Sequence, residues 1–158
     1  MTKSFHRLIL LLPFAFVLHV GEEYLSGYPA WASAVSGHPM GLPIFLGSNI
    51  GFILVMAMLT RWTTRARTPR AAFWLLAWTA GNLFWNFVYH AGGVLAYGLP
   101  APGLYSATLI YLPLTLMIWR AALKEKIVSP AALTGTIAIG GAFMGAVAAI
   151  GIYHLGGV

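Results

Sequence analysis

The sequence predicts an all-α protein, a polytopic bundle of five membrane-spanning helices that makes up one domain over residues 1–158. Hydrophobic residues account for 59% of the chain and charged residues for 8%, about one third of the charged fraction of a soluble domain. The mean hydropathy of +0.81 points the same way. No period-two alternation of the kind found in barrel strands occurs, so the apolar stretches are expected to pair their backbone groups as helices.

Each expected span is an apolar stretch close to the length of about 20 residues that a helix needs to cross a bilayer. In chain order the five spans are residues 5–26, 43–62, 71–97, 103–119 and 131–155. The breaks between them are rich in Gly, Pro and other turn formers, and lie at 27–41, 63–70, 98–102 and 121–130. Pro13 and Pro113 each remove a backbone donor, so the first and fourth spans are expected to bend.

The first span also has features of a signal peptide. Lys3 and Arg7 precede its apolar run, and Ala32-Ser33-Ala34 offers a small-residue cleavage pattern. That pattern lies too far beyond the apolar run for cleavage. We therefore expect the first span to be retained as a helix.

All nine basic residues fall on one side of this arrangement. They precede the first span or lie in the second-to-third and fourth-to-fifth connections, as Lys3, Arg7, Arg61, Arg65, Arg67, Arg70, Arg120, Lys124 and Lys126. Because Lys and Arg gather on cytoplasmic loops, the N-terminus is expected in the cytoplasm and the C-terminus outside. The net charge is +6, but the sequence has no basic stripe interleaved with aromatics of the kind that binds nucleic acid. We therefore expect the protein to contact lipid and no nucleic acid.

The chain has no cysteine and only three acidic residues. Glu125 lies among lysines and is expected to be a solvated charge. Glu22 and Glu23 stand near the outer end of the first span, and His19 shares a helix face with both because residues three and four apart are neighbours. Ionisable groups within a span are costly and usually functional, so these three residues are candidate catalytic and metal-ligating groups.

The third span carries a second polar stripe at four-residue spacing, formed by Asn82, Asn86 and His90. At a rise of about 1.5 Å per residue, both stripes lie roughly 17 to 29 Å from the cytoplasmic ends of their spans. Asn49 and Tyr105 fall in the same outer layer. We therefore expect the two stripes to converge, with His90 joining the catalytic and metal-binding set. The candidate substrate-binding residues are Asn49, Asn82, Asn86, Tyr105 and Trp85.

The motif His19-x-x-Glu22-Glu23, followed by His90 and a Pro-Gly pair, resembles the HXXEE-motif family of small bacterial integral membrane proteins. The family's Tyr-x-Pro-Gly pattern is altered here: Tyr97-Gly98-Leu99-Pro100 replaces it, and Pro102-Gly103 comes later. The resemblance covers roughly His19 to Pro113. It implies a protein of the bacterial inner membrane with a shared polar site, and no established activity.

Our leading hypothesis is a metal-assisted enzyme that acts on a lipid or other apolar substrate. Imidazole and carboxylate ligands suit zinc, iron and manganese, and a catalytic zinc often uses three protein ligands. His19, His90 and Glu23 are the first choices for the ligands. Glu22 is then a fourth ligand or the general base, and the sequence leaves the roles of the two glutamates open.

Three alternatives remain at this point. A metal-free acid–base pair of glutamate and histidine would suit an isomerase or cyclase of an isoprenoid-like lipid, with Trp85 near a cationic centre. A non-enzymatic cation or proton transporter, or a lipid-binding module, would use the same groups to carry protons or bind a cation. In the third alternative, His90 and Asn86 neutralise the glutamates and hold the bundle together.

Two further features are a pair of glycines in the last span and two histidines near the outer surface. Gly141 and Gly145 form a small-residue stripe that allows close helix contact, either within one subunit, which we favour, or in a homo-oligomer. His38 and His154 lie near the outer surface. We interpret them as solvated side chains and treat a role as supplementary ligands as the alternative.

Overall fold

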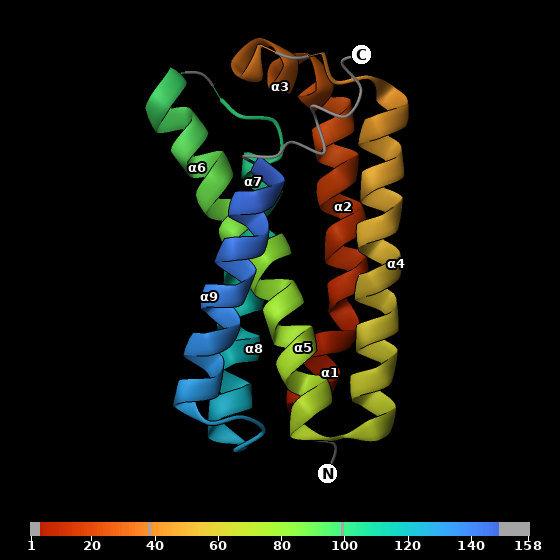
Figure 1. Cartoon of the computed structure of the whole chain (residues 1–158), viewed down its shortest axis with the longest axis vertical. Coiled ribbons are helices and arrows are strands. Elements are labelled where there is room, and N and C mark those ends of the chain that lie inside the picture. The colour runs from red at the N-terminus through yellow and green to blue at the C-terminus, as the bar shows by residue number, and fades with distance from the viewer. Residues whose placement is uncertain (1–3, 38, 99, 149–158) are drawn as a thin grey trace.

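The computed structural model describes residues 4–37, 39–98 and 100–148, and every element in them is helical (Figure 1). The predicted all-α class is confirmed for this part of the chain. The elements in order are α1 (Ser4–Leu8), η1 (Ile9–Leu11), α2 (Leu12–Leu25), α3 (Tyr28–Ser36), α4 (Leu42–Ala66), α5 (Pro69–Thr79), η2 (Ala80–Trp85), α6 (Asn86–Tyr97), α7 (Leu104–Ser106), η3 (Ala107–Tyr111), α8 (Leu112–Lys124) and α9 (Pro130–Ala146).

Three runs of helix are long and apolar enough to cross a membrane, which indicates a membrane protein. They correspond to the first, second and fourth predicted spans, at Ser4–Leu25, Leu42–Ala66 and Leu104–Lys124. Two of them change helix type just before a proline. The 3₁₀ turn η1 precedes Pro13, and the π turn η3 precedes Pro113. Proline has no amide hydrogen to donate, so one intrahelical hydrogen bond is missing at each position, and this loss explains the local change of helix type.

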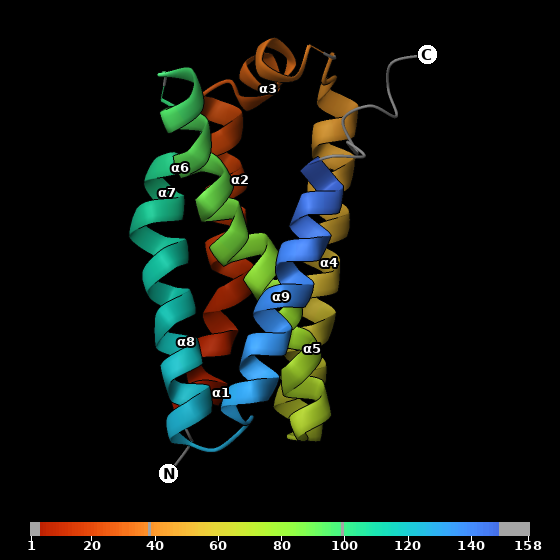
Figure 2. The same ribbon diagram turned by 60° about the vertical axis from the view of Figure 1, so that its left-hand side comes forward.

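The third predicted span is a run of consecutive helical segments, α5, η2 and α6, over Pro69–Tyr97. It is not among the three runs that are long and apolar enough to cross a membrane. Its π turn η2 changes the direction of the helix, and α6 leans away from the axis of α5 (Figures 1 and 2). The described part of the fifth span, α9, has 17 residues.

The connection at residues 27–41 differs from the expected turn-rich break because it contains the helix α3. Gly27 and Gly37 adopt positive φ angles of 79° and 71° at its two ends, a conformation open to glycine. Pro29 lies in its first turn, where the missing amide donor costs no hydrogen bond. Figure 1 shows α3 lying across the end of the bundle opposite to α1.

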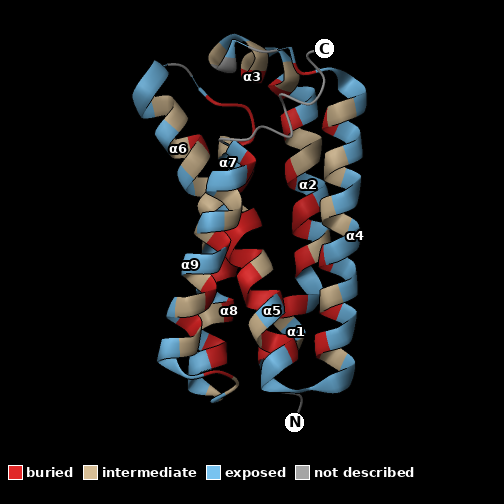
Figure 3. Ribbon diagram, viewed as in Figure 1, coloured by how far each residue is buried: buried red, intermediate tan, exposed pale blue. Residues whose placement is uncertain are grey.

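The helices enclose a core that runs along the bundle, while apolar side chains also cover its outside (Figure 3). Fully buried examples are Phe5, Leu12 and Tyr111, whereas Phe14 is 71% and Leu109 73% exposed. Apolar residues on both faces are typical of a helix bundle surrounded by lipid. The start of α1, the α4–α5 turn and the α8–α9 turn share one end of the bundle (Figure 2). The predicted clustering of the basic connections is therefore seen in the fold.

Helix α9 packs closely against η2 through glycines on both sides. A Cβ atom on Gly140 would lie 2.5 Å from the Gly81 nitrogen and 2.7 Å from Ala80 Cβ. Gly141 is covered by the Trp85 indole, whose nearest atom would be 2.9 Å from such a Cβ. Of the predicted small-residue stripe, Gly141 thus packs within the chain, whereas nothing among the described residues lies within 4 Å of the Cβ position of Gly145.

Gly140→Ala should lower the free energy of unfolding by about 1–3 kcal/mol, because backbone atoms of η2 cannot easily give way to the added methyl group. Gly145→Ala is the matched control on the same helix, since nothing lies within 4 Å of its Cβ position and alanine favours helix. Denaturant titrations in detergent micelles measure both. Equal effects of the two substitutions would contradict the close contact of α9 with η2.

Candidate functional site

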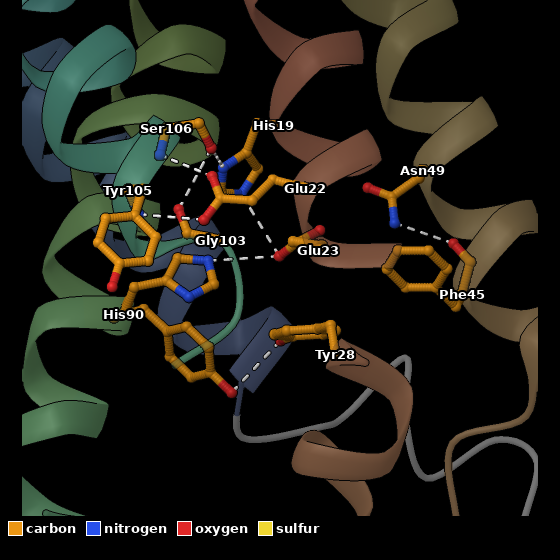
Figure 4. A network of polar contacts seen from close by, with 11 residues as sticks. His19, Glu22, Glu23, Tyr28, Phe45, Asn49, His90, Gly103, Tyr105 and Ser106 are labelled. Atoms are coloured by element: carbon orange, nitrogen blue, oxygen red, sulfur yellow. Dashed lines mark hydrogen bonds and ion pairs between the residues drawn. The ribbon is translucent and has the colours of Figure 1, made fainter. Parts of the chain in front are cut away.

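Three buried ionisable side chains from two helical runs meet near the α3 end of the bundle (Figure 4). His19 Nε2 and His90 Nε2 each lie 3.3 Å from the same oxygen, Glu23 Oε1. The exposed fractions are 2% for His19, 4% for Glu23 and 0% for His90. The predicted convergence of these residues is confirmed, and we call them the His–Glu triad.

Local helix geometry places the first two members. His19 and Glu23 are four residues apart in α2 and therefore lie on one face. His90 comes from α6, beyond the π turn that redirects the third helical run. The rings of His19 and His90 meet edge to face with centroids 5.1 Å apart. Tyr28 and Tyr89 also contact the His90 ring, which fixes its position by packing.

The triad atoms are close but are not aligned as hydrogen bonds. Neither His19 Nε2 nor His90 Nε2 has a hydrogen-bond partner among the described residues. One ligand atom from each of the three residues lies within 4.8 Å of the others. Two nitrogens and one oxygen that face each other in this way are a donor set that could hold a metal ion or share protons.

A hydrogen bond orients the His19 ring from the opposite side. His19 Nδ1 lies 2.8 Å from Ser106 Oγ, and Ser106 Oγ is also 3.3 Å from the Gly103 carbonyl oxygen. When Ser106 donates to that carbonyl, His19 Nδ1 carries the proton and its Nε2 presents a lone pair to the triad. Metal-binding histidines are commonly oriented through their second nitrogen in this manner.

Gly103 forms one wall of the triad. Its φ angle is +93°, and a Cβ atom there would lie 2.8 Å from His19 Cε1 and 2.9 Å from both Glu23 Cγ and His90 Cε1. A residue with a side chain would be strained and would also push apart all three members. The Pro-Gly pair that comes later than the family pattern requires, Pro102-Gly103, is therefore the one that contacts the site.

Glu22 does not join the triad but binds the N-terminus of the helix Leu104–Lys124. Its Oε1 accepts from the Tyr105 amide at 3.1 Å, and its Oε2 accepts from the Ser106 amide at 2.6 Å. Free amide groups and the helix dipole favour a carboxylate at this point. The two adjacent glutamates thus have different tasks, and Glu22 indirectly holds Gly103 and Ser106 against the triad.

Glu125 also binds a helix N-terminus, which corrects the expectation of a solvated charge. Its Oε1 accepts from Ser4 Oγ at 2.9 Å and from the Phe5 amide at 3.1 Å, and its Oε2 is buried. These contacts anchor the start of α1. Two of the three acids in the chain therefore cap helices, and Glu23 alone is held between histidines.

A polar cavity of ≈ 30 Å³ lies beside the triad, enough for about two water molecules. Its polar lining comes from four helical segments and consists of His19, Glu23, Ser48, Asn49, Asn82 and Asn86. Asn49 and Asn82 each donate a hydrogen bond to a carbonyl of their own helix, whereas Asn86 Oδ1 has no partner among the described residues. The three predicted asparagines thus share one cavity with His19 and Glu23.

Two other predicted substrate-binding residues lie elsewhere. The Tyr105 side chain is 70% exposed, and only its backbone amide takes part through Glu22. The Trp85 indole donates to the Ile137 carbonyl at 2.9 Å and packs on Gly141, so it contacts α9 and does not line the cavity. His38 and His154 lie outside the described residues.

Several residues that contact the triad or its cavity were not among the predicted site residues. Ser106 and Tyr111 both contact His19, and the Tyr111 ring lies 4.3 Å from it between centroids. Phe16 lines the cavity one turn before His19. The Pro102-Gly103 pair could have indicated that the segment after it, with Ser106, lies at the site. Nothing in local periodicity distinguished Tyr111 from a core aromatic.

The sequence also matches a known protein family. Residues 10–118 match the family described as "Protein of unknown function with HXXEE motif". The match covers more than half of the chain, so the protein belongs to this family, as the resemblance indicated. No curated protein and no solved structure matches it significantly.

Gly103→Ala should disrupt the triad and lower the free energy of unfolding more than Gly98→Ala does. Both positions have positive φ angles, so both substitutions carry the left-handed cost of about 1–2 kcal/mol. Only the added methyl group of Gly103→Ala would collide with the triad, because nothing lies within 4 Å of the Cβ position of Gly98. Denaturation and the rate of chemical modification of His19 and His90 measure the difference. Unchanged histidine reactivity in Gly103→Ala would refute the assignment of this wall.

Proposed function

We propose that the protein is a membrane-embedded, metal-assisted enzyme that acts on a lipid or other apolar substrate, with His19, Glu23 and His90 as ligands of a divalent metal. The observation that carries this proposal is the triad itself. Its two Nε2 atoms each lie 3.3 Å from the same oxygen of Glu23 in a buried position, and neither has a hydrogen-bond partner among the described residues. A carboxylate at this depth needs a compensating charge, and a divalent cation held by these three groups would supply it.

The donor chemistry fits such an ion. Two imidazoles and one carboxylate are a ligand set of catalytic zinc and of non-haem iron, and both leave a coordination position open. When bound, the metal would supply Lewis-acid activation of water or of a polar substrate group. His19 matches the usual arrangement because Ser106 holds its second nitrogen. Packing against Tyr28 and Tyr89 holds His90 instead.

The surrounding side chains divide the remaining tasks. Asn86, with its unpartnered oxygen, can orient water or a substrate hydroxyl in the cavity beside Glu23. The other two asparagines add polar surface to the same cavity. Glu22 stays on the helix N-terminus and holds Ser106 in place. We therefore assign Glu22 as a positioning residue and Glu23 as the metal ligand.

An apolar groove between α2 and α4 supports access from the lipid. It has a volume of ≈ 160 Å³ and is lined by Phe16, Val17, Val20, Leu46, Asn49, Ile50 and Ile53. Phe16 and Asn49 also line the polar cavity, so their side chains form the wall between the groove and the triad. A hydrocarbon chain in the groove would bring a polar end group to Asn49.

The orientation follows from the same arrangement. We propose five spans with the N-terminus in the cytoplasm of a bacterium, so that the triad lies in the outer half of the inner membrane. The positive connections at the N-terminal end of the bundle support this orientation. The α5–η2–α6 run and α9 serve as the third and fifth spans.

Wild-type protein purified from membranes should carry about one equivalent of zinc, iron or manganese, measured by elemental analysis. His19→Ala, His90→Ala and Glu23→Gln should lose the metal because each removes a ligand. Glu22→Gln is the matched control: it should retain the metal and lose about 1 kcal/mol of stability through a weaker helix cap. Ser106→Ala should weaken metal binding by about 10- to 100-fold.

Two outcomes would reject the metal. Metal-free wild type that gains none from added zinc, while Glu23→Gln folds and loses turnover of a lipid, would favour the acid–base isomerase or cyclase. Loss of stability in all triad variants, without binding or turnover in wild type, would make the triad architectural. Loss of metal in Glu22→Gln alone would reverse the assignment of the two glutamates.

The orientation has its own test. A topology reporter inserted near Thr64 should read as cytoplasmic, and one fused after Val158 should read as external, because the basic connections stay inside. Reporter activity in intact cells measures both positions. The opposite pair of readings would move the triad to the cytoplasmic half of the membrane.

A further inference from the structure

The opposite end of the bundle contains an open groove that the proposed enzyme does not use. It has a volume of ≈ 500 Å³ and lies between the start of α5 and the α8–α9 connection, lined by Pro69, Arg70, Phe73, Lys126, Ile127, Val128, Ser129 and Ala132. We call it the basic groove. Its lining combines two cations with mostly apolar side chains and contains no acid.

The two cations form no ion pair with a carboxylate among the residues that the structure describes. Of the three acidic residues in the chain, Glu22 and Glu23 lie at the far site. Glu125 lies at this end, where its carboxylate accepts hydrogen bonds from Ser4 and Phe5. Basic residues outnumber this one acid here, so the groove lies in a region of net positive charge.

The position of both cations is defined by the backbone. Arg70 is the second residue of α5. Lys126 has a φ angle of 54° in a turn closed by the Lys126 and Ile127 amides, which donate to the carbonyls of Leu123 and Ala122 at 3.1 and 2.8 Å. The two side chains thus start from fixed points on facing walls.

The remaining lining indicates what kind of anion fits. Phe73 and Ala132 are partly buried apolar residues on the two walls, and Trp74, 46% exposed, follows Phe73. Tryptophan is enriched where membrane meets water. A ligand with an anionic head beside Arg70 and Lys126 and an apolar tail along Phe73 and Ala132 would match both halves of the groove.

We infer that the basic groove binds the phosphate headgroup of an anionic phospholipid, with one acyl chain along Phe73 and Ala132 near the starts of α5 and α9. Basic pockets between membrane helices are suited to such headgroups. The site is separate from the His–Glu triad and depends on the membrane location of the chain, not on the metal. Soluble phosphate shares the headgroup chemistry but leaves the apolar walls uncovered.

The test measures lipid retained by the full-length protein after extraction from vesicles of phosphatidylglycerol and phosphatidylcholine, by native mass spectrometry. Wild type should retain phosphatidylglycerol, and Arg70→Ala/Lys126→Ala should bind it roughly 30-fold more weakly, as expected for two lost basic contacts. The matched control, Arg61→Ala/Arg65→Ala, removes the same charge from α4 and should retain the lipid. Arg70→Lys/Lys126→Arg should also retain it.

Two further arms separate the lipid from its alternatives. Ala132→Trp keeps both cations but fills the groove, so it should lose the lipid if the acyl chain lies there. Inorganic phosphate should not displace the lipid, because it lacks the apolar contacts. Equal retention by the two double-alanine variants, full retention by Ala132→Trp, or equal displacement by phosphate would each overturn the inference. The groove variants should leave the metal content unchanged, so failure of this inference is distinguishable from failure of the proposed metal site.

Discussion

The buried carboxylate of Glu23 is the constraint on which the rest of the structure depends. A charge this far from water is tolerated only beside a compensating partner, and the fold provides two imidazoles, from His19 and His90. One comes from the same helix and the other from more than sixty residues further along the chain. The helices must therefore meet at a fixed register, because a shift of either one would leave the carboxylate unpaired.

Departures from α-helical geometry occur on helical runs that carry or contact the triad. The π turn η2 redirects the run that carries His90, and the π turn η3 follows Ser106 and contains Tyr111. Such turns change the direction of a helix without breaking it, and they often occur at functional sites. Gly103 completes the arrangement, because only a residue without a side chain fits against all three members. The site is thus built from irregular backbone at three places in the bundle.

The division of labour among the acids has consequences for function. Glu22 and Glu125 both bind helix N-termini, one at each end of the bundle. Glu23 alone is available for chemistry, which limits the proposed enzyme to one carboxylate and two histidines. Glu125 is the acid at the basic end, where the basic residues outnumber it. One sparse set of charges therefore accounts for the triad, for the helix anchors and for the basic groove.

The sequence by itself determined the helical class and the convergence of His19, Glu23 and His90. These depend on apolar length, four-residue spacing and depth, which are local properties of a helix. Only the tertiary structure decided that Glu22 caps the helix after Gly103, because its partners lie 83 and 84 residues away. It likewise placed Trp85 against α9. The direction of a side chain around its helix depends on neighbours from distant segments, and no local pattern encodes them.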